Sequence, residues 1–349
     1  MSHGGVIVDP MNVLEKLLER VRISFLEAYQ IARAIIDGKF DETIIAALLV
    51  ALRAHGETPD IIAGFAKALR EASLKVNTRG LSPIDTAGTG GDGFHTINAS
   101  TAAALVTASL GVPTLKHGNR SVSSRSGSAD FLEALGYKID HGPHEAEFML
   151  RKVGFAFLYA PRYHPALKRV MPIRRKLGIR TIFNLIGPLA NPGSIRIQVL
   201  GVASPKLLEV MTTAALMLNY DRVLVVHGKP GIDEVSISGE TEVFELRRKS
   251  LDRYTISPED LGLRRYRIED LRVSSPNESA KRFLAVINGH GSPADRDFIA
   301  ANAGAALYVA ERASDIRDGV EMALQAIEEG IVAKFIDTLC EVSKYAGLR

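Results

Sequence analysis

The stretch Asp85-Thr86-Ala87-Gly88-Thr89-Gly90-Gly91-Asp92-Gly93 decides the fold. It continues a strand signal that begins at Ile84, and within a few residues it reaches Asn98-Ala99-Ser100-Thr101, which opens an apolar helix. Closely spaced glycines let backbone N–H groups turn toward a phosphate, and the start of a helix adds its positive end. The sequence therefore predicts a strand, a loop that suits a pyrophosphate, and a helix.

This glycine loop has neither the dinucleotide-binding spacing nor the Gly-Lys-Ser/Thr ending of a P-loop. A plain glycine turn followed by a helix cap is the alternative interpretation. Asp92 favours a ligand site, because a carboxylate beside bound phosphates usually acts through a cation or a ribosyl hydroxyl.

Downstream of the loop, strand and helix signals alternate, which is typical of a largely parallel sheet. We expect helices from Ser100 and Ser128, and strands at Pro113–Leu115, Phe155–Tyr159, Gln198–Gly201 and Val223–His227. Further on we expect antiparallel strand-like material over Val235–Leu246, a charged loop over Arg247–Arg253, and three helical segments between Glu278 and Tyr345.

Upstream of the loop, apolar residues from Val13 to Ser73 recur at helical spacing, with interruptions at Asp37-Gly38 and Thr58-Pro59-Asp60. The basic, proline-containing segment His164–Pro192 breaks the later alternation, so we assign it to the same helical unit. The predicted fold is α/β: a small all-helical N-terminal domain, residues 10–76 with 164–192 returning to it, and a large α/β domain, residues 77–163 and 193–345, with a mostly parallel central sheet.

The composition is that of an ordinary globular protein of 349 residues, with 46% hydrophobic residues and a net charge of +3. The single cysteine, Cys340, excludes an intramolecular disulfide and favours the cytoplasm. Apolar runs such as Ile44–Leu52 are shorter than the roughly 20 residues of a membrane span, so we expect no membrane contact. The nearly balanced charge gives no reason to expect nucleic acid as a partner.

Two further segments contain polar and charged residues that could bind a ligand. Lys116–Asp130 follows a predicted strand and combines three cations with serine hydroxyls and an amide, which suits a phosphate, although a solvated surface loop is the alternative. Asp233-Glu234 follows the buried strand at Val223–His227. Adjacent carboxylates repel each other unless they are solvated or bridged, so they indicate either a magnesium site or an exposed acidic turn.

Taken in chain order, five motifs closely resemble the anthranilate phosphoribosyltransferase family, and the resemblance covers nearly the whole chain. They are GTGGDG at 88–93, NAST at 98–101, KHGNRSVSSRSGSAD at 116–130, GIRTIFNLIGPLANP at 178–192, and VHG at 226–228 followed by GIDEVS at 231–236. The resemblance implies a nucleoside phosphorylase/phosphoribosyltransferase-like fold. It also implies the transfer of a phosphoribosyl group from 5-phosphoribosyl-1-diphosphate to anthranilate, in tryptophan biosynthesis.

The same resemblance implies the residues of the site. The phosphoribosyl diphosphate would be bound by Gly88, Gly91, Asp92, Thr96, Asn98, Ser100, Thr101, Lys116 and Ser128. Anthranilate would be bound by Gly88, His117, Asn119, His164, Arg174, Gly187 and Pro188, and magnesium, at two ions per subunit, by Ser100, Asp233 and Glu234. The family also implies a homodimer, and no residue is assigned as a general base.

Arg174 is the residue for which side-chain chemistry independently agrees with the resemblance, because an aromatic carboxylate needs a planar, bidentate donor. Its basic neighbours Arg175 and Lys176 leave a solvated helix face as the alternative. Two other functions stay open at this point. A pyrimidine nucleoside phosphorylase has a similar architecture but needs no metal pair, and a non-enzymatic relative would bind nucleic acid through a basic groove.

Overall fold

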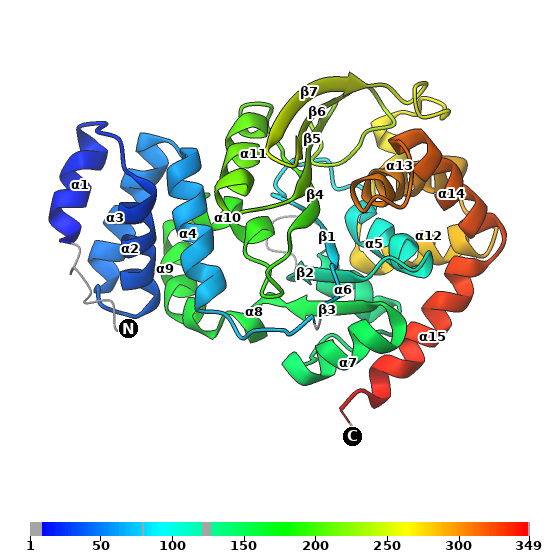
Figure 1. The fold of residues 1–349 in the computed structure, drawn as a ribbon, viewed down its shortest axis with the longest axis horizontal. Helices are drawn as coiled ribbons and strands as arrows, with labels where there is room; N and C mark the ends of the chain where they lie inside the picture. Colours follow the sequence, from blue (N-terminus) through cyan, green and yellow to red (C-terminus); the bar gives the residue numbers. More distant parts are fainter. Residues whose placement is uncertain (1–8, 79, 121–126, 348–349) are drawn as a thin grey trace.

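The computed structural model describes residues 9–78, 80–120 and 127–347, and its N-terminal part is a helical bundle. The bundle consists of α1 (Pro10–Leu18), α2 (Phe25–Ile36), α3 (Glu42–His55) and α4 (Pro59–Glu71). Local capping explains where these helices start: Ser24 and Glu27 form a reciprocal capping box on α2, and Thr58 caps α4 ahead of a proline. Figure 1 shows the bundle at one end of the molecule, beside the sheet.

The described residues form a seven-stranded sheet in the order β3-β2-β1-β4-β5-β6-β7. The first five strands in this order are parallel, and β6 and β7 add an antiparallel edge. The strands are β1 (Ile84–Gly88), β2 (Thr114–Gly118), β3 (Phe155–Tyr159), β4 (Ile197–Gly201), β5 (Arg222–Gly228), β6 (Thr241–Arg247) and β7 (Ser250–Ile256). The predicted α/β fold with a mostly parallel sheet is confirmed.

Helices cover both faces of this sheet (Figure 1). α11 (Leu207–Met217) packs on β5 and β6 and also on α4 of the bundle, whereas α5 (Ala99–Ser109) and α13 (Pro293–Val309) pack on the strands from the other face. The remaining helices are α6 (Ser128–Ala134), α7 (Pro143–Val153), α8 (Ala160–Tyr163), α12 (Pro276–Ile287), α14 (Ile316–Glu328), α15 (Ile331–Tyr345) and the 3-10 turn η3 (Ile268–Leu271).

Two expectations for the second half of the chain are wrong. The predicted loop Arg247–Arg253 belongs mostly to a hairpin, because only Arg248 and Lys249, both with positive φ, form the turn between β6 and β7. Much of β7 remains exposed, so its charged side chains face solvent. The C-terminal region contains four helices instead of three, because Ser292 caps a new helix at Pro293 and Gly330 separates the last two helices.

The segment His164–Pro192 folds into short helices beside the bundle. These are the 3-10 turn η1 (Pro165–Arg169), α9 (Val170–Leu177), α10 (Ile182–Leu185) and the 3-10 turn η2 (Gly187–Leu189). α9 packs on α3, and α10 packs on both α3 and α4. η2, by contrast, contacts β2, so this segment connects the bundle with the sheet. The domain limits at residues 76 and 192 stay a prediction. Among the described residues, no helix combines the length and apolar character needed to cross a lipid bilayer.

Candidate active site

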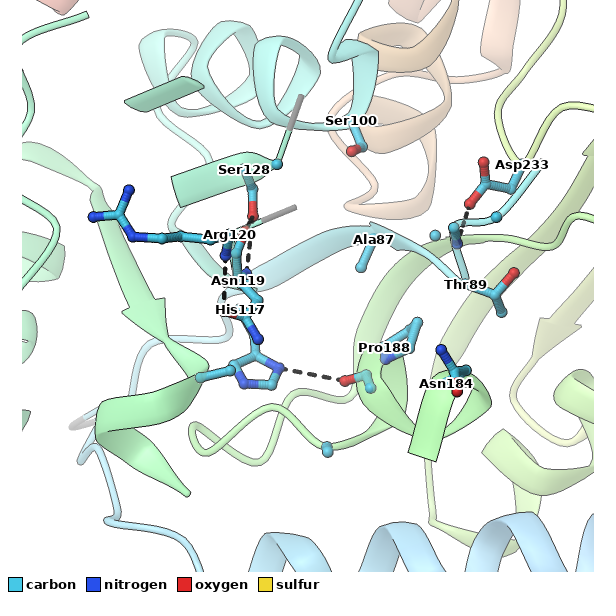
Figure 2. A pocket seen from close by; sticks show the side chains of 18 of the residues that line it. Ala87, Thr89, Ser100, His117, Asn119, Arg120, Ser128, Asn184, Pro188 and Asp233 are labelled. Atoms are coloured by element: carbon cyan, nitrogen blue, oxygen red, sulfur yellow. Dashed lines mark hydrogen bonds between the residues drawn. The ribbon is translucent and has the colours of Figure 1, made fainter. Parts of the chain in front are cut away.

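The carboxyl ends of β1 and β2 open into a cavity of about 440 Å³. Every predicted site residue lines this cavity except Thr101. Figure 2 shows Asp233 on one side of it and His117 on another, with Ala87 and Ser100 between them. Part of the predicted basic loop, residues 121–126, lies outside the described residues. Ligands of open α/β sheets gather at this edge, so the cavity is the candidate active site.

The glycine loop is shaped by contact with the Asp233–Glu234 turn. Gly90, Gly91 and Gly93 all have positive φ angles, a backbone conformation that residues with a Cβ atom rarely adopt. The Gly90 N–H donates to Asp233 Oδ2 at 2.6 Å (Figure 2). A Cβ atom on Gly88 would lie only 2.2 Å from the same carboxylate oxygen. The glycines are therefore needed to let the loop fold around the acidic turn.

Three carboxylates meet at this end of the cavity: Asp92, Asp233 and Glu234. Burial, and then the charge of Asp92, raises the pKa of Asp233; burial, and then the charge of Asp233, raises the pKa of Glu234 to about 8. Among the described residues, neither Asp233 nor Glu234 forms an ion pair with a basic side chain. A cation bound here would relieve the repulsion between them.

Magnesium fits this donor set. No group of three His, Cys, Asp or Glu side chains within the described ranges could enclose a metal by itself. Magnesium does not need such a cage, because it usually binds through one or two carboxylates, several waters and substrate phosphates. Asp233 and Glu234, with Ser100 on the same cavity wall, provide hard oxygen ligands of that kind.

The N-terminus of α5 faces the acidic turn. Asn98 caps the helix by accepting from the Thr101 N–H at 3.2 Å, and the Ser100 N–H donates to Glu234 Oε1 at 3.2 Å. Thr101 itself is fully buried, and its hydroxyl has no hydrogen-bond partner among the described residues. Its side chain does not line the cavity, because one helical residue turns about 100° away from the direction of Ser100.

Lys116 lies deeper than the sequence suggested. Only 2% of it is exposed, and its ammonium donates to the Thr86 carbonyl oxygen. Burial lowers its pKa, whereas the charges of Asp85 and Glu234 oppose that shift. Lys116 still contributes to the cavity wall, and it brings positive charge to the acidic end.

His117 and His164 form a buried pair on the wall of the cavity. Their Nε2 atoms are 3.2 Å apart, and His117 Nδ1 lies 3.3 Å from the Gly187 carbonyl oxygen. Burial is the main cause that lowers the pKa of both rings, for His164 to about 4. Both rings are therefore neutral at pH 7, so they present an uncharged surface to the cavity.

The end of β2 is held against the start of α6. The Asn119 N–H donates to Ser128 Oγ at 3.2 Å, and a Cβ atom on Gly118 would lie 2.0 Å from that oxygen. Arg120, which follows, is exposed and forms ion pairs with Asp130 and Glu133. Asn119 and Ser128 thus present polar groups to the cavity from two adjoining elements.

Arg174 differs from its basic neighbours. It is half-buried, it lines the cavity, and among the described residues it forms no ion pair. Its Nη2 donates to Asn184 Oδ1 at 3.2 Å, and its guanidinium lies 5.6 Å from the centre of the Phe183 ring. Arg175 and Lys176 extend from the same helix, and Lys176 pairs with Glu42 of the bundle. A half-buried cation without an anionic partner, in a cavity wall, is suited to a carboxylate ligand.

Three residues that were not predicted from the sequence hold the site together. Asn184 orients Arg174, Arg180 donates to the carbonyls of Gly90 and Gly91, and Asn191 donates to the buried carboxylate of Asp85 at 2.9 Å. All three lie within the motif at 178–192, so their polar character among apolar residues was the available signal. Nothing in that motif indicates which partner each one contacts.

Comparisons with known proteins show the family to which this chain belongs. A glycosyl transferase family helical bundle domain matches residues 11–73, and the a/b domain of that family matches residues 81–333. The chain is 54% identical to anthranilate phosphoribosyltransferase from Aeropyrum pernix, over 95% of this chain and 96% of that protein. It is 53% identical to the enzyme of the same name from Caldivirga maquilingensis, over 90% and 92% respectively. This chain belongs to the anthranilate phosphoribosyltransferase family.

Solved structures of anthranilate phosphoribosyltransferases are similar to this chain over nearly its whole length. Anthranilate phosphoribosyltransferase from Thermus thermophilus superposes with a TM-score of 0.90 at 38% identity, covering 96% of this chain and all of that one. The enzyme from Saccharomyces cerevisiae, in complex with PRPP and Mg, superposes with a TM-score of 0.87 at 27% identity, covering 96% and 98%. The family suggested by the five motifs is confirmed.

Proposed function

We propose that this chain transfers the phosphoribosyl group of 5-phosphoribosyl-1-diphosphate to the amine of anthranilate, which gives N-(5-phosphoribosyl)anthranilate and pyrophosphate in tryptophan biosynthesis. The observation that carries the proposal is that one cavity holds side chains of both charges that form no salt bridge within the described chain. Asp233 and Glu234, which form no salt bridge among the described residues, lie on the sheet side, and Arg174 lies on the side of the bundle. The names of the relatives support this function.

The donor binds, in this proposal, between the glycine loop and the N-terminus of α5. Gly88, Gly91, Asp92, Thr96, Asn98, Ser100, Lys116 and Ser128 line that part of the cavity. Backbone N–H groups and a helix N-terminus stabilise phosphate oxygens. Magnesium, held by Asp233, Glu234 and Ser100, neutralises charge on the departing pyrophosphate. The complex of the yeast enzyme with PRPP and Mg supports magnesium, and two ions per subunit are part of the proposal.

The acceptor binds with its carboxylate on Arg174, beside His117, Asn119, His164, Gly187 and Pro188. The bond between C1 of the ribose and the pyrophosphate oxygen breaks, the bond between C1 and the amine nitrogen forms, and the proton that the nitrogen loses is taken up by the departing pyrophosphate. An aromatic amine is neutral at pH 7, so it attacks without a general base. Positioning and electrostatic stabilisation then account for catalysis, and the neutral histidines exclude water from the reacting groups.

Both alternatives to this function are weaker. A phosphorylase needs no metal pair, so it gives no role to the carboxylates of Asp233 and Glu234, whose mutual repulsion a bound cation would relieve. A nucleic-acid-binding relative needs a basic groove, whereas this cavity has three carboxylates in its wall. The relatives named above support neither alternative.

The decisive experiment follows the loss of anthranilate fluorescence with purified protein, 5-phosphoribosyl-1-diphosphate and magnesium. We expect consumption that stops when the metal is chelated. The double variant Asp233→Asn/Glu234→Gln should lose activity and require more magnesium. Folded wild-type protein that consumes no anthranilate would refute the proposed function, and phosphorolysis of pyrimidine nucleosides would then be measured.

We also propose a homodimer that forms through the helical bundle, in the cytoplasm. Large apolar side chains are exposed on α1 to α3 and their connections: Met11, Leu18, Val21, Leu26 and Val50. Exposed apolar groups of this kind favour a protein contact. Sedimentation of wild type and a Leu18→Glu/Leu26→Glu variant tests the dimer, because the variant should sediment as a monomer.

A further inference from the structure

The 3-10 turn η2 is held by side chains from three separate elements. The carbonyl oxygen of Gly187 lies 3.3 Å from His117 Nδ1 of β2. The carbonyl of Pro188 accepts from Gln198 Nε2 of β4 at 2.9 Å, and the carbonyl of Leu189 accepts from Arg70 Nε of α4 at 2.6 Å. Three consecutive carbonyl groups are thus fixed from three directions, in a turn whose Pro188 and Leu189 are buried, and this suits the wall of a site.

One hydroxyl group joins two of these donors. Tyr220, which is 3% exposed, accepts from Arg70 Nη2 and donates to Gln198 Oε1 at 2.8 Å. Because the Gln198 amide receives this proton on its oxygen, its nitrogen must face Pro188. The guanidinium of Arg70 also stacks over the Tyr220 ring at 4.9 Å. The result is a directed chain of hydrogen bonds from the helical bundle, through the sheet, to η2.

We propose that Arg70, Tyr220 and Gln198 form a positioning relay that fixes the acceptor wall at Gly187 and Pro188. The inference rests on the proposed function, because it assigns that wall to anthranilate. None of the three relay residues lines the cavity, so they act through the turn and do not touch the substrate. The relay couples the seating of the bundle on the sheet to the shape of the acceptor pocket, and none of its side-chain hydrogen bonds reaches the glycine loop that follows β1.

This arrangement predicts a specific kinetic signature. Loosening η2 moves the wall against which the aromatic ring packs, whereas Gly90 of the glycine loop keeps its contact with Asp233, and Ser100 of α5 keeps its contact with Glu234. The KM for anthranilate should therefore rise while the KM for 5-phosphoribosyl-1-diphosphate stays constant. A relay that contributes only stability would leave both constants unchanged, or would change both together.

The test uses Tyr220→Phe, which removes one oxygen atom, and Gln198→Glu, which keeps the shape but places a carboxylate oxygen against the Pro188 carbonyl. Each variant should raise the KM for anthranilate by roughly 3- to 10-fold, the size expected for one buried hydrogen bond. The KM for 5-phosphoribosyl-1-diphosphate should change by less than about 2-fold. Tyr254→Phe is the matched control, because Tyr254 donates to Glu245 on β6, away from the cavity.

The outcomes separate the inference from the function on which it rests. A selective rise in the KM for anthranilate in both relay variants, absent from Tyr254→Phe, supports the relay. Unchanged constants, or an equal rise for both substrates, overturn it even if wild type is active. An inactive, folded wild-type protein refutes the proposed function and the relay with it. If Gln198→Glu fails to fold, Tyr220→Phe alone decides.

Discussion

Arg174 allows the sharpest test of the acceptor site. Replacement by alanine removes the one half-buried cavity cation that has no carboxylate partner within the described chain. A pair of charge-assisted hydrogen bonds to a carboxylate contributes roughly 2–4 kcal/mol, which corresponds to an increase of about 30- to 1,000-fold in the KM for anthranilate. The KM for 5-phosphoribosyl-1-diphosphate should stay within about 2-fold of wild type.

The same substitution should cost little stability. Arg174 loses its bond to Asn184 Oδ1 and its stacking on Phe183, but the empty protein also loses a cation whose pKa is lowered by burial. These effects oppose each other, so the melting temperature should stay within about 3 °C of wild type. A functional residue and a structural residue therefore give different patterns.

The assay is steady-state fluorescence with each substrate varied in turn, and it is repeated for Arg174→Lys and Arg175→Ala. Lysine keeps the charge but not the planar fork, so its KM should fall between those of wild type and Arg174→Ala. Arg175 is on the same helix but does not line the cavity, and its removal should have no effect. Equal effects of Arg174→Ala and Arg175→Ala would show that only the general positive charge of α9 matters, and would refute the assignment.

Three further predictions concern the acidic turn and the histidine pair. The folded-state pKa of Glu234, about 8, exceeds its ordinary value, so metal-free wild type should lose stability as pH rises toward 8. Metal-free Glu234→Gln should lose less stability over the same pH range. A melting-temperature difference between wild type and this variant that does not grow with pH would contradict this prediction. The pKa of His164 is lowered to about 4, so the stability of wild type should fall as pH drops from about 6.5 toward 4. The stability of His164→Gln should fall less over this range. Melting temperatures of the two proteins that change in parallel with pH would exclude this explanation. Gly88→Ala places a Cβ atom 2.2 Å from Asp233 Oδ2 and should raise the KM for 5-phosphoribosyl-1-diphosphate by more than about 10-fold; an unchanged KM would show that the turn can yield.

Sequence reasoning could identify the elements that carry local signals. The glycine loop and α5 were predictable because glycine spacing and a helix cap act over a few residues, and the apolar runs of β3, β4 and β5 indicate buried strands. β7 could not be found in this way. It is an edge strand whose charged side chains are exposed, so it gains its structure from pairing with β6 and not from its own composition.

The same limit applies to side chains in the site. Ser100 and Thr101 are equally good phosphate ligands by chemistry, and the rotation of one residue along α5 turns the first toward the cavity and the second into the core. Arg174 and Arg175 are distinguished in the same way by α9. Tyr220 and Gln198 have no signal at all in the sequence, because their role depends on contact with Arg70, 150 residues away from Tyr220.

The distribution of charge in the cavity supports the proposed orientation of the acceptor. Of the cations in the described wall, Arg120 is paired, Lys116 is buried against the Thr86 carbonyl, and Lys168 lies on the 3-10 turn η1 at the bundle side. In the proposed binding mode, the bound diphosphate repels the anthranilate carboxylate, so this carboxylate is expected at Arg174. The amine, being neutral, carries no such penalty near the donor. Because Arg174 belongs to α9 and the acidic turn to the sheet, this orientation depends on how the bundle is seated, which is the geometry that the Arg70 relay maintains.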